Sequence, residues 1–522
     1  MKQLTTQELL LLNNLMYMTN SGGMLDIASY KPGITVGEIA ERTLNAGLKA
    51  GKDYGSYITG EDWTQMLNAI MNDPQLREVQ LIASHSDTGP GSGGGSSALF
   101  ADPATGEAVV VFRGTADGEW RDNFLGGAAT GASDGVSTAQ QQNALDWYQS
   151  LDLDAYSSVT VTGHSKGGNK AKYITVLDDS VTRCVSFDGQ GFSDEFIRTY
   201  ASQIRQNQGK ISNNNVDYDY VNLLLNDIGS ETFYQGQNYG TGGFLENHCP
   251  NTFFGVDEAG NLIMTETERP EEMAALDHYL NTMLRSMPES QRQDTLEIIG
   301  NLMQEGFSED GNWPSALSNL ATWRNADEIY SVLAFTIAYE YVNPKFPDQI
   351  RSVLNRFGME DAGNVVNWGT ILLNLGITVR IPSAFGGAMM IMHLLPDELR
   401  EKVEQWIPIL NTDSVFSFTG QDLRINSGIT GLARFSVSDT ALMQAAEQLN
   451  SSAAAIRAIS EELSGISAQF TGMLELLLRA SVSLRANSLA TRSTRCAALA
   501  DNLNEIAFCY ARTEQSVMGQ FE

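Results

Sequence analysis

The stretch that most constrains this chain is residues 159–168, which read Val-Thr-Val-Thr-Gly-His-Ser-Lys-Gly-Gly. Four residues of high β-propensity lead into a G-x-S-x-G turn, and residues 169–174 are compatible with a helix. A strand, a sharp turn and a helix in this order predict a nucleophile elbow, in which the turn presents Ser165. Any side chain at Gly163 or Gly167 is expected to collide with the adjoining strand or helix. The helix amino end would also let the Lys166 N–H face a developing oxyanion.

The composition bounds the number of domains and argues against some classes of function. With 522 residues, the chain is expected to fold as two or three domains. Its net charge of −30, from 33 Lys and Arg against 63 Asp and Glu, argues against a nucleic-acid-binding protein. The same charge argues against adsorption to anionic membranes by charge alone. Four cysteines without CxxC spacing predict neither a disulfide framework nor a zinc site.

Two hydrophobic segments lack the form of membrane-targeting elements. The amino-terminal segment is amphipathic and leucine-rich, without the uninterrupted apolar core of a signal peptide. Residues 365–395 are the best candidate for a span, but they contain Asn367, Asn374, Arg380 and Pro382. No run reaches the roughly 18 apolar residues that a span needs. We expect a buried helix pair there, with a membrane-dipping element as the alternative.

The first half of the chain alternates between helical and strand patterns, which predicts an α/β fold. Thr35 and Glu38 have the spacing of a capping box in front of a helix. Helices are predicted at residues 5–19, 35–50, 61–71 and 138–150, and strands at residues 79–83, 97–100, 108–112, 159–162, 185–188 and 216–225.

A second motif, Phe-Arg-Gly-Thr at residues 112–115, precedes the G-x-S-x-G turn and is followed by a tryptophan and polar residues. This pattern resembles the oxyanion strand of class 3 lipases, an α/β-hydrolase family. The G-H-S-K-G-G-N form of the turn is similar to a bacterial lipase-like family of poorly defined function. The resemblance implies an α/β-hydrolase domain in which Thr115 supplies a second oxyanion N–H. Residues 126–138 stand where such lipases carry a lid, and a disordered surface loop is an equal alternative.

The base must come from five histidines, at positions 85, 164, 248, 278 and 393. A serine hydroxyl is a poor nucleophile until a histidine takes its proton, and in α/β-hydrolases this histidine follows both the serine and the acid. The first of the five precedes Ser165, the second lies inside the turn, and the last two lie in helical stretches. His248, in a loop behind a strand, is therefore the predicted base.

Two carboxylates are candidates for the acid that orients the histidine. Asp188 ends the strand after the elbow helix, and Asp227 follows the next predicted strand. In α/β-hydrolases the acid usually follows the second strand after the nucleophile, which favours Asp227 over Asp188. The resemblance agrees, because Asn-Asp-Ile-Gly at residues 226–229 is similar to the D-x-V-P loop of lipases, with glycine in place of the proline. Asp217 and Asp219 alternate with aromatic residues and are expected to face solvent or the helix layer.

These residues together predict acyl transfer from an ester. Ser165 would attack the carbonyl carbon, His248 would move the proton, and Asp227 would orient and stabilise the imidazolium. The N–H groups of Thr115 and Lys166 would hold the oxyanion. The mechanism needs no metal and no organic cofactor. The resemblance to class 3 lipases implies a lipid or acyl ester as the substrate.

Strand patterns stop near residue 265, and the rest of the chain is predicted to be helical. We therefore expect an α/β-hydrolase domain at 1–265, a helical connecting or cap region at 266–430, and a long helical hairpin at 431–522. The hairpin would need a partner face, either on another chain or on residues 271–410. Its apolar residues recur every seven positions, at Leu442, Leu449, Ile456, Leu463 and Phe470.

Two short motifs in this hairpin resemble type VII secretion substrates. Phe-Thr-Gly at residues 470–472 stands where the WXG and LXG families have W-x-G, and Tyr510 with Glu514 gives Y-x-x-x-E. The resemblance implies a secreted bacterial effector or toxin that acts on membrane lipids, with small helical partner proteins and a cognate inhibitor. In those families the helical module usually precedes the toxin domain, whereas here it follows the hydrolase.

Three functions remain open from the sequence. The first is an exported serine ester hydrolase of lipase or phospholipase type. The second is a cytoplasmic bacterial esterase whose helical half forms a homo-oligomer. The third is an inactive hydrolase fold that serves as a scaffold, against which the complete Ser, Asp and His set argues.

Overall fold

The structure is a computed structural model that describes residues 2–86, 96–115, 123, 136–240, 243–287, 345–358 and 439–468, with short stretches or single positions between 292 and 343 and between 486 and 497. Two compact units make up the chain, Met1–Glu328 with Phe346–Ile377 and Ile329–Lys345 with Thr378–Glu522. The predicted boundaries at residues 265 and 430 stay predictions. Residues 365–395, residues 126–135 of the segment predicted as a lid or surface loop, and both motifs that resemble secretion substrates lie outside the described residues.

The first unit is built on one sheet of eight strands in the order β1-β2-β3-β4-β5-β6-β7-β10. Strands β3 to β7 are parallel, whereas β1, β2 and β3 pair antiparallel at one edge and β10 pairs antiparallel with β7 at the other. The strands are β1 (Gln80–Ser86), β2 (Ser96–Asp102), β3 (Glu107–Phe112), β4 (Ser158–His164), β5 (Arg183–Phe187), β6 (Ile211–Val216), β7 (Ser230–Tyr234) and β10 (Glu266–Thr267). A separate two-stranded sheet pairs β8 (Gly255–Val256) with β9 (Leu262–Ile263).

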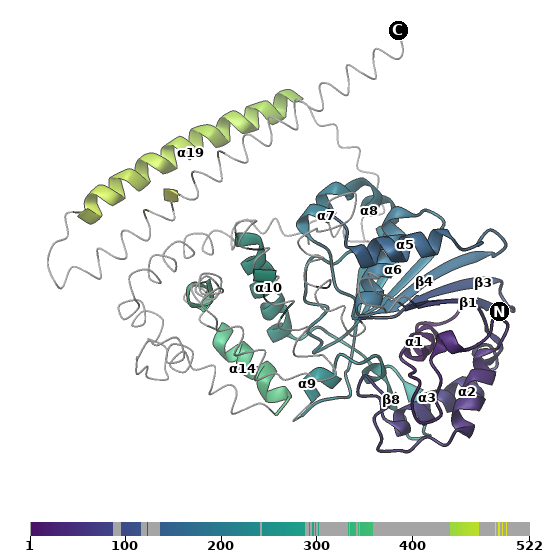
Figure 1. Ribbon diagram of the computed structural model, residues 1–522. Helices are drawn as coiled ribbons and strands as arrows, with labels where there is room; N and C mark the ends of the chain where they lie inside the picture. Colours follow the sequence, from purple (N-terminus) through teal and green to yellow (C-terminus); the bar gives the residue numbers. More distant parts are fainter. Residues whose placement is uncertain are drawn as a thin grey trace, which may run out of the picture. The chain divides into compact units, whose positions relative to one another are not determined.

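Helices cover both faces of the eight-stranded sheet (Figure 1). Strands β3 to β7 follow one another in both sequence and space, and the crossover helices α5, α6 and α8 pack side by side on one face. Helix α1 crosses the opposite face against β3, β4 and β5. The helices of this sheet domain are α1 (Thr6–Leu15), α2 (Val36–Asn45), α3 (Gly60–Asn72), α5 (Ala139–Gln149), α6 (Lys166–Leu177), α7 (Asp194–Thr199), α8 (Ala201–Asn207) and α9 (Gly243–Glu246), with single 3-10 turns at Ile27–Ser29, Leu76–Glu78, Gln208–Lys210 and Pro250–Phe253.

Helix α1 positions the strand that leads to Ser165. A capping box between Thr5 and Glu8 starts the helix, and its leucines are buried in a core shared with α2, α3 and one face of the sheet. The helix also makes a polar contact with β4, because Asn13 Nδ2 donates a hydrogen bond to the hydroxyl oxygen of Thr162 over 2.8 Å. The amino-terminal helix is therefore part of the core of the sheet domain. The capping box predicted between Thr35 and Glu38 is confirmed at the start of α2.

Helices follow the sheet domain, as the sequence predicts. Helix α10 (Glu271–Ser286) packs against α14 (Phe346–Arg356) within the first unit. A small core joins this pair to the loop after β6, and it contains Leu223, Met273, Val353 and Phe357. The loop that carries part of the site is thus covered by helices from beyond residue 265.

In the second unit, helix α19 (Asp439–Ala468) matches the start of the predicted hairpin. Two buried hydroxyls link it to helical positions farther along the chain: Ser460 Oγ donates to the Ala486 carbonyl and Ser493 Oγ donates to the Ala453 carbonyl. Ala453 contacts Ser493, whereas Ser460, seven positions later, contacts Ala486, seven positions earlier than Ser493. The two segments therefore run antiparallel here. The hairpin as a whole stays a prediction, since its turn and most of its second arm lie outside the described residues.

Candidate active site

The G-x-S-x-G turn has the strand–turn–helix form that the sequence predicts. Strand β4 ends at His164, helix α6 begins at Lys166, and Ser165 between them has φ 60° and ψ −128°. A positive φ is unfavourable for a residue with a Cβ and is typical of a strained functional turn. The side chain of Ser165 is thereby held at the carboxyl end of a central strand.

Close backbone contacts explain both glycines of this turn. A Cβ atom on Gly163 would lie 2.1 Å from the carbonyl group of Gly167, inside the helix. A Cβ atom on Gly167 would lie 2.0 Å from the carbonyl oxygen of Phe112, on the neighbouring strand. Both distances are far below van der Waals contact and both neighbours are backbone atoms, so any larger residue would force the strand and helix apart.

His248 lies directly beside the serine, as the elimination among the five histidines predicts. Its Nε2 atom is 2.8 Å from Ser165 Oγ. The histidine follows the short helix α9 in a turn before Pro250, and both side chains are nearly closed off from solvent, with Ser165 6% and His248 8% exposed. This contact has the geometry in which an imidazole accepts a hydroxyl proton.

The carboxylate that contacts His248 is Asp219, and the expectation that this residue faces solvent or the helix layer is wrong. Its Oδ1 atom lies 2.6 Å from His248 Nδ1, and the residue is 0% exposed. The other oxygen, Oδ2, accepts the N–H groups of Val221 and Asn222 at 3.0 and 2.9 Å. The carboxylate is therefore fixed by its own loop and oriented toward the imidazole. Ser165, His248 and Asp219 form a continuous hydrogen-bonded chain.

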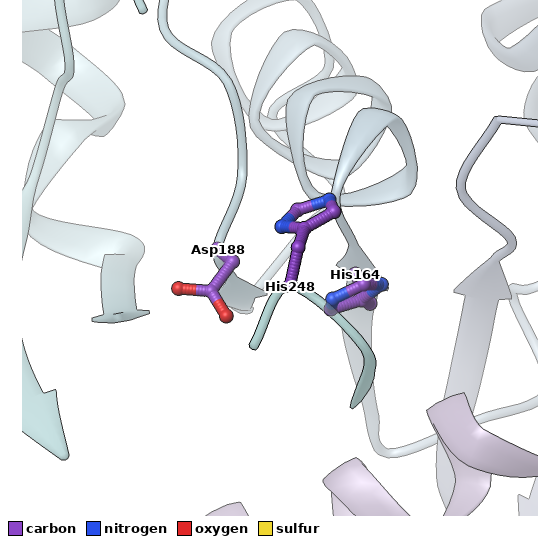
Figure 2. A group of neighbouring side chains, drawn as sticks. All are labelled: His164, Asp188 and His248. Carbon is purple, nitrogen blue, oxygen red and sulfur yellow. The ribbon is translucent and has the colours of Figure 1, made fainter. Parts of the chain in front are cut away.

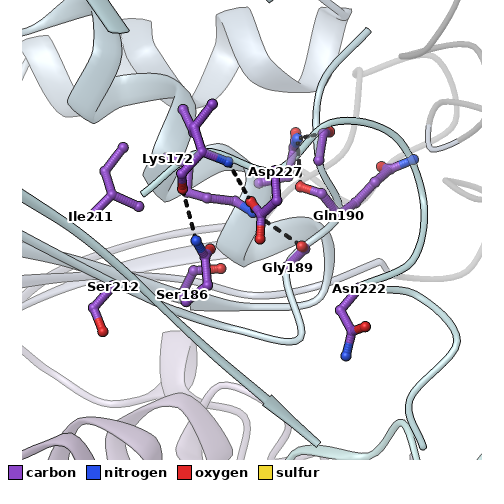
Figure 3. A network of polar contacts seen from close by, with 12 residues as sticks. Lys172, Ser186, Gly189, Gln190, Ile211, Ser212, Asn222 and Asp227 are labelled. Atoms are coloured by element: carbon purple, nitrogen blue, oxygen red, sulfur yellow. Dashed lines mark hydrogen bonds and ion pairs between the residues drawn. The ribbon is translucent and has the colours of Figure 1, made fainter. Parts of the chain in front are cut away.

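The prediction that Asp227 partners the histidine is wrong. Asp227 Oδ1 is 2.5 Å from Lys172 Nζ on α6, and that ammonium also donates to the Gly189 carbonyl over 3.1 Å (Figure 3). Both charged side chains are buried, with relative exposures of 0% for Lys172 and 7% for Asp227. This ion pair joins the elbow helix to the loops after β5 and β6, which is a structural position.

The prediction of Asp227 failed because strand β6 ends earlier than the sequence indicates. The rule that the acid follows the second strand after the serine still holds. Strand β6 spans Ile211–Val216, and the apolar run at 221–225 lies in a loop in which Leu225 has φ 69°. Asp219 is thus one of two carboxylates, with Asp217, that directly follow the second strand beyond the serine. The sequence Ser-Asn-Asn-Asn has low β-propensity, whereas Val-Asn-Leu-Leu-Leu reads as a strand. A shorter strand assignment would have pointed to Asp217 and Asp219 without distinguishing between them.

Asp188, the other candidate considered, lies close to the chain of three but does not contact His248 through a hydrogen bond. Its Oδ1 atom accepts the Val216 N–H over 2.7 Å and the Asn222 side-chain amide over 3.2 Å. Burial, and then the nearby Asp219, raise the pKa of Asp188 well above its ordinary value. Asn222 contacts both carboxylates, so it links Asp188 to Asp219.

His164, inside the elbow, is tied to the amino-terminal helix. Its Nδ1 atom is 2.7 Å from Tyr17 Oη, and the same hydroxyl accepts the Gly114 N–H over 3.2 Å. Burial lowers the pKa of His164 well below its ordinary value, and the nearby His248 acts in the same direction. Both effects favour the neutral form of the imidazole. Sequence reasoning did not identify this role for Tyr17, which lies 147 positions before His164.

The two predicted oxyanion donors flank the serine. The Lys166 N–H opens helix α6 directly after Ser165. Thr115 follows Gly114, where an added Cβ would lie 3.1 Å from Ser165 Cβ. The Thr115 side chain is held by Asn123, whose Nδ2 donates to Thr115 Oγ1 over 2.6 Å. The end of strand β3 thus approaches the elbow as the Phe-Arg-Gly-Thr motif predicts, and the oxyanion role of both N–H groups is proposed below.

Three side chains with the composition of a metal site also lie close together among the described residues. His164, Asp188 and His248 each offer one ligand atom, and these atoms lie within 4.8 Å of one another. Figure 2 shows the three side chains gathered beside the ends of two neighbouring strands. All three are buried.

The serine at a strained strand–helix turn, the parallel sheet behind it, and the chain order of serine, aspartate and histidine decide the fold. The fold is that of the α/β-hydrolases. A family model described as Mbeg1-like matches residues 71–299. This range contains every residue of the hydrogen-bonded chain. No curated protein matches the chain.

Two solved lipase structures are similar to this α/β-hydrolase at low identity. The Lip2 lipase from Yarrowia lipolytica is 15% identical, with a TM-score of 0.29, over 51% of this chain and 84% of that one. A triacylglycerol lipase from Penicillium expansum is also 15% identical, with a TM-score of 0.21, over 30% of this chain and 70% of that one. Within the described residues, no helix is both long and apolar enough to cross a membrane.

Proposed function

We propose that this chain is a serine carboxylic-ester hydrolase of lipase or phospholipase type. One observation carries the proposal: His248 bridges Ser165 and Asp219 through its two ring nitrogens, at 2.8 and 2.6 Å. A serine, a histidine and a buried carboxylate in this arrangement are the minimal set for nucleophilic acyl transfer. The lipid ester as substrate rests on the resemblance of residues 112–115 and of the elbow to class 3 lipases.

The first half of the reaction forms an acyl-enzyme. Asp219 holds the Nδ1–H tautomer of His248, which leaves Nε2 free to accept the Ser165 hydroxyl proton as Oγ attacks the ester carbonyl carbon. The carbonyl oxygen becomes an oxyanion between the N–H groups of Thr115 and Lys166. When the tetrahedral intermediate collapses, His248 gives its proton to the leaving alkoxide, and the alcohol departs.

The second half returns the serine. His248 takes a proton from a water molecule, whose oxygen attacks the acyl carbon, and the resulting oxyanion occupies the same two N–H groups. Collapse releases the carboxylic acid, and His248 returns the proton to Ser165 Oγ. Atoms and charge balance without a metal or an organic cofactor.

The test is covalent labelling combined with turnover. The purified chain should react with a fluorophosphonate probe, peptide mass spectrometry should locate the adduct on Ser165, and acyl esters should be hydrolysed. The Ser165→Ala variant should lose both signals, while Ser193→Ala, at the cap of α7, keeps them. A series from short to long acyl chains, with a phospholipid included, identifies the substrate class. A wild-type chain without label or turnover would favour the inactive scaffold.

We propose, as a second function, that residues 431–522 direct export or bind partner proteins. The heptad pattern in α19 and the antiparallel contacts of Ala453 and Ser460 with Ser493 and Ala486 support a helical module. Small helical partner proteins, a cognate inhibitor and release by a type VII pathway belong to this proposal. They rest on the resemblance of the two short motifs to secretion substrates.

Truncation after residue 430 tests the export proposal. In the source organism, the truncated chain should stay in the cells with its esterase activity intact, while the full chain appears in the medium. Immunoblots of both fractions, with a cytoplasmic marker as the lysis control, measure this. Equal secretion of the two forms would remove the export proposal and favour an intracellular esterase with an oligomerisation module.

A further inference from the structure

We propose that His164, Asp188 and His248 form a binding site for a divalent transition metal, and that metal in this site blocks the esterase by taking His248 Nε2 away from Ser165. The binding part stands on the geometry of the three side chains alone. The inhibitory part rests on the proposed function. Zn²⁺ is the probe.

Each of the three side chains is already oriented through one of its two polar atoms. His164 Nδ1 is held by Tyr17 Oη at 2.7 Å, and His248 Nδ1 is held by Asp219 Oδ1 at 2.6 Å. Asp188 Oδ1 accepts the Val216 N–H and the Asn222 amide. Metal-binding histidines characteristically use the second ring nitrogen in this way, because the outer partner fixes the ring and its tautomer.

The remaining atoms are the ones that a cation would use. Within the described residues, His164 Nε2 and Asp188 Oδ2 are buried and have no hydrogen-bond partner. His248 Nε2 contacts Ser165 Oγ at 2.8 Å. Burying a carboxylate oxygen and a ring nitrogen without partners costs free energy, and a bound cation would satisfy both atoms. The exposed fractions are 2% for His164, 0% for Asp188 and 8% for His248.

The ligand set selects the class of metal. Two imidazoles and one carboxylate suit Zn²⁺ and similar transition metals, whereas Ca²⁺ and Mg²⁺ prefer oxygen ligands alone. Zn²⁺ holds nitrogen and oxygen at about 2.0–2.2 Å, which places ligand atoms roughly 3.4 Å apart in a tetrahedron. Each of the three side chains offers one ligand atom within 4.8 Å of the other two, so side-chain shifts of roughly an ångström close the site. The fourth position would remain for water or Ser165 Oγ.

The consequence for catalysis follows from the shared histidine. Nε2 cannot coordinate Zn²⁺ and accept the Ser165 proton at the same time, since both use the same lone pair. Metal binding would therefore leave the serine without its base while Asp219 keeps its contact to Nδ1. The rate of acylation, and with it fluorophosphonate labelling, should fall as the site fills.

The experiment measures binding and labelling separately on the full chain after chelator treatment. Isothermal titration with Zn²⁺ should give one site per chain in the wild type and also in Ser165→Ala. His164→Gln should weaken binding about 100-fold or more, because even loss of an outer partner costs 10–100-fold. His278→Gln, which removes an exposed imidazole on α10, is the matched control and should bind like the wild type. If His164→Gln does not fold by circular dichroism, Asp188→Asn takes its place.

The outcomes are distinct. Absence of Zn²⁺ uptake, or equal uptake by wild type and His164→Gln, would overturn the binding site and leave these atoms as polar groups for ordered water. Stoichiometric uptake with unchanged fluorophosphonate labelling would overturn the inhibition. If the wild type takes up Zn²⁺ but never labels, even without metal, the proposed esterase fails while the metal site stands.

Discussion

Asp219→Asn is expected to lower kcat for ester hydrolysis by about 10⁴-fold, with little change in folding. The reason is the direction of the hydrogen bonds. Asp219 Oδ2 accepts two backbone N–H groups, so asparagine must place its oxygen there and present its NH₂ group to His248 Nδ1. That amide donates to Nδ1 and moves the ring proton to Nε2, where it opposes acceptance of the Ser165 proton. Steady-state kinetics on a soluble ester measures the loss.

Asp227→Asn is the matched control, because it makes the same chemical change at the aspartate that the sequence favoured. It should keep kcat per folded molecule within a few-fold of the wild type, since Asp227 contacts Lys172 and not His248. A reversal of the two results, with a large kcat loss in Asp227→Asn and little in Asp219→Asn, would show that the observed contact does not operate in catalysis.

The elbow could be predicted from the sequence because its constraints are local. Gly163 and Gly167 are required by contacts within a few residues and with one neighbouring strand, and Ser165 needs a backbone conformation that the turn itself imposes. His248 could be selected because few histidines compete, and chain order, the turn itself and the predicted helices exclude the other four. The local sequence pattern and the small number of histidines were therefore enough to predict these residues.

The acid could not be selected in this way, because its position depends on where a strand ends. Strand β6 has an asparagine-rich sequence, and its pairing with β5 and β7 gives it a strand conformation that its own residues do not favour. The apolar run after Asp219 instead supplies Leu223 to the core with α10 and α14. Tertiary packing thus gives each segment a conformation that its own residues do not favour, and Asp219 lies between the two segments.

The contacts around the serine could not be predicted from sequence patterns either. Tyr17 Oη contacts both His164 on the elbow and the N–H of Gly114 on the oxyanion strand. Lys172 joins the elbow helix to the loops after β5 and β6 through Gly189 and Asp227. These contacts join positions from 17 to 147 residues apart, and no spacing rule predicts them. They hold the elbow from both faces of the sheet.

The buried pair of Lys172 and Asp227 gives the second large effect, on stability. Lys172→Met should lower the free energy of unfolding by about 3–5 kcal/mol, because it leaves a buried carboxylate without its cation. Asp227→Asn should cost a similar amount by stranding the ammonium, while the asparagine oxygen can still accept the Ile228 N–H. Urea unfolding followed by tryptophan fluorescence measures both changes.

The double variant separates the pair interaction from the fold around it. With both charges removed, neither partner is left as an uncompensated buried ion, so Lys172→Met with Asp227→Asn should cost clearly less than the sum of the two single changes. The fluorophosphonate labelling rate of the folded double variant should match that of the wild type, because Ser165, His248 and Asp219 keep their contacts. Strict additivity would show that the two charges do not act as a pair. If the double variant kept wild-type stability but lost labelling, Asp227 would have a direct part in the chemistry.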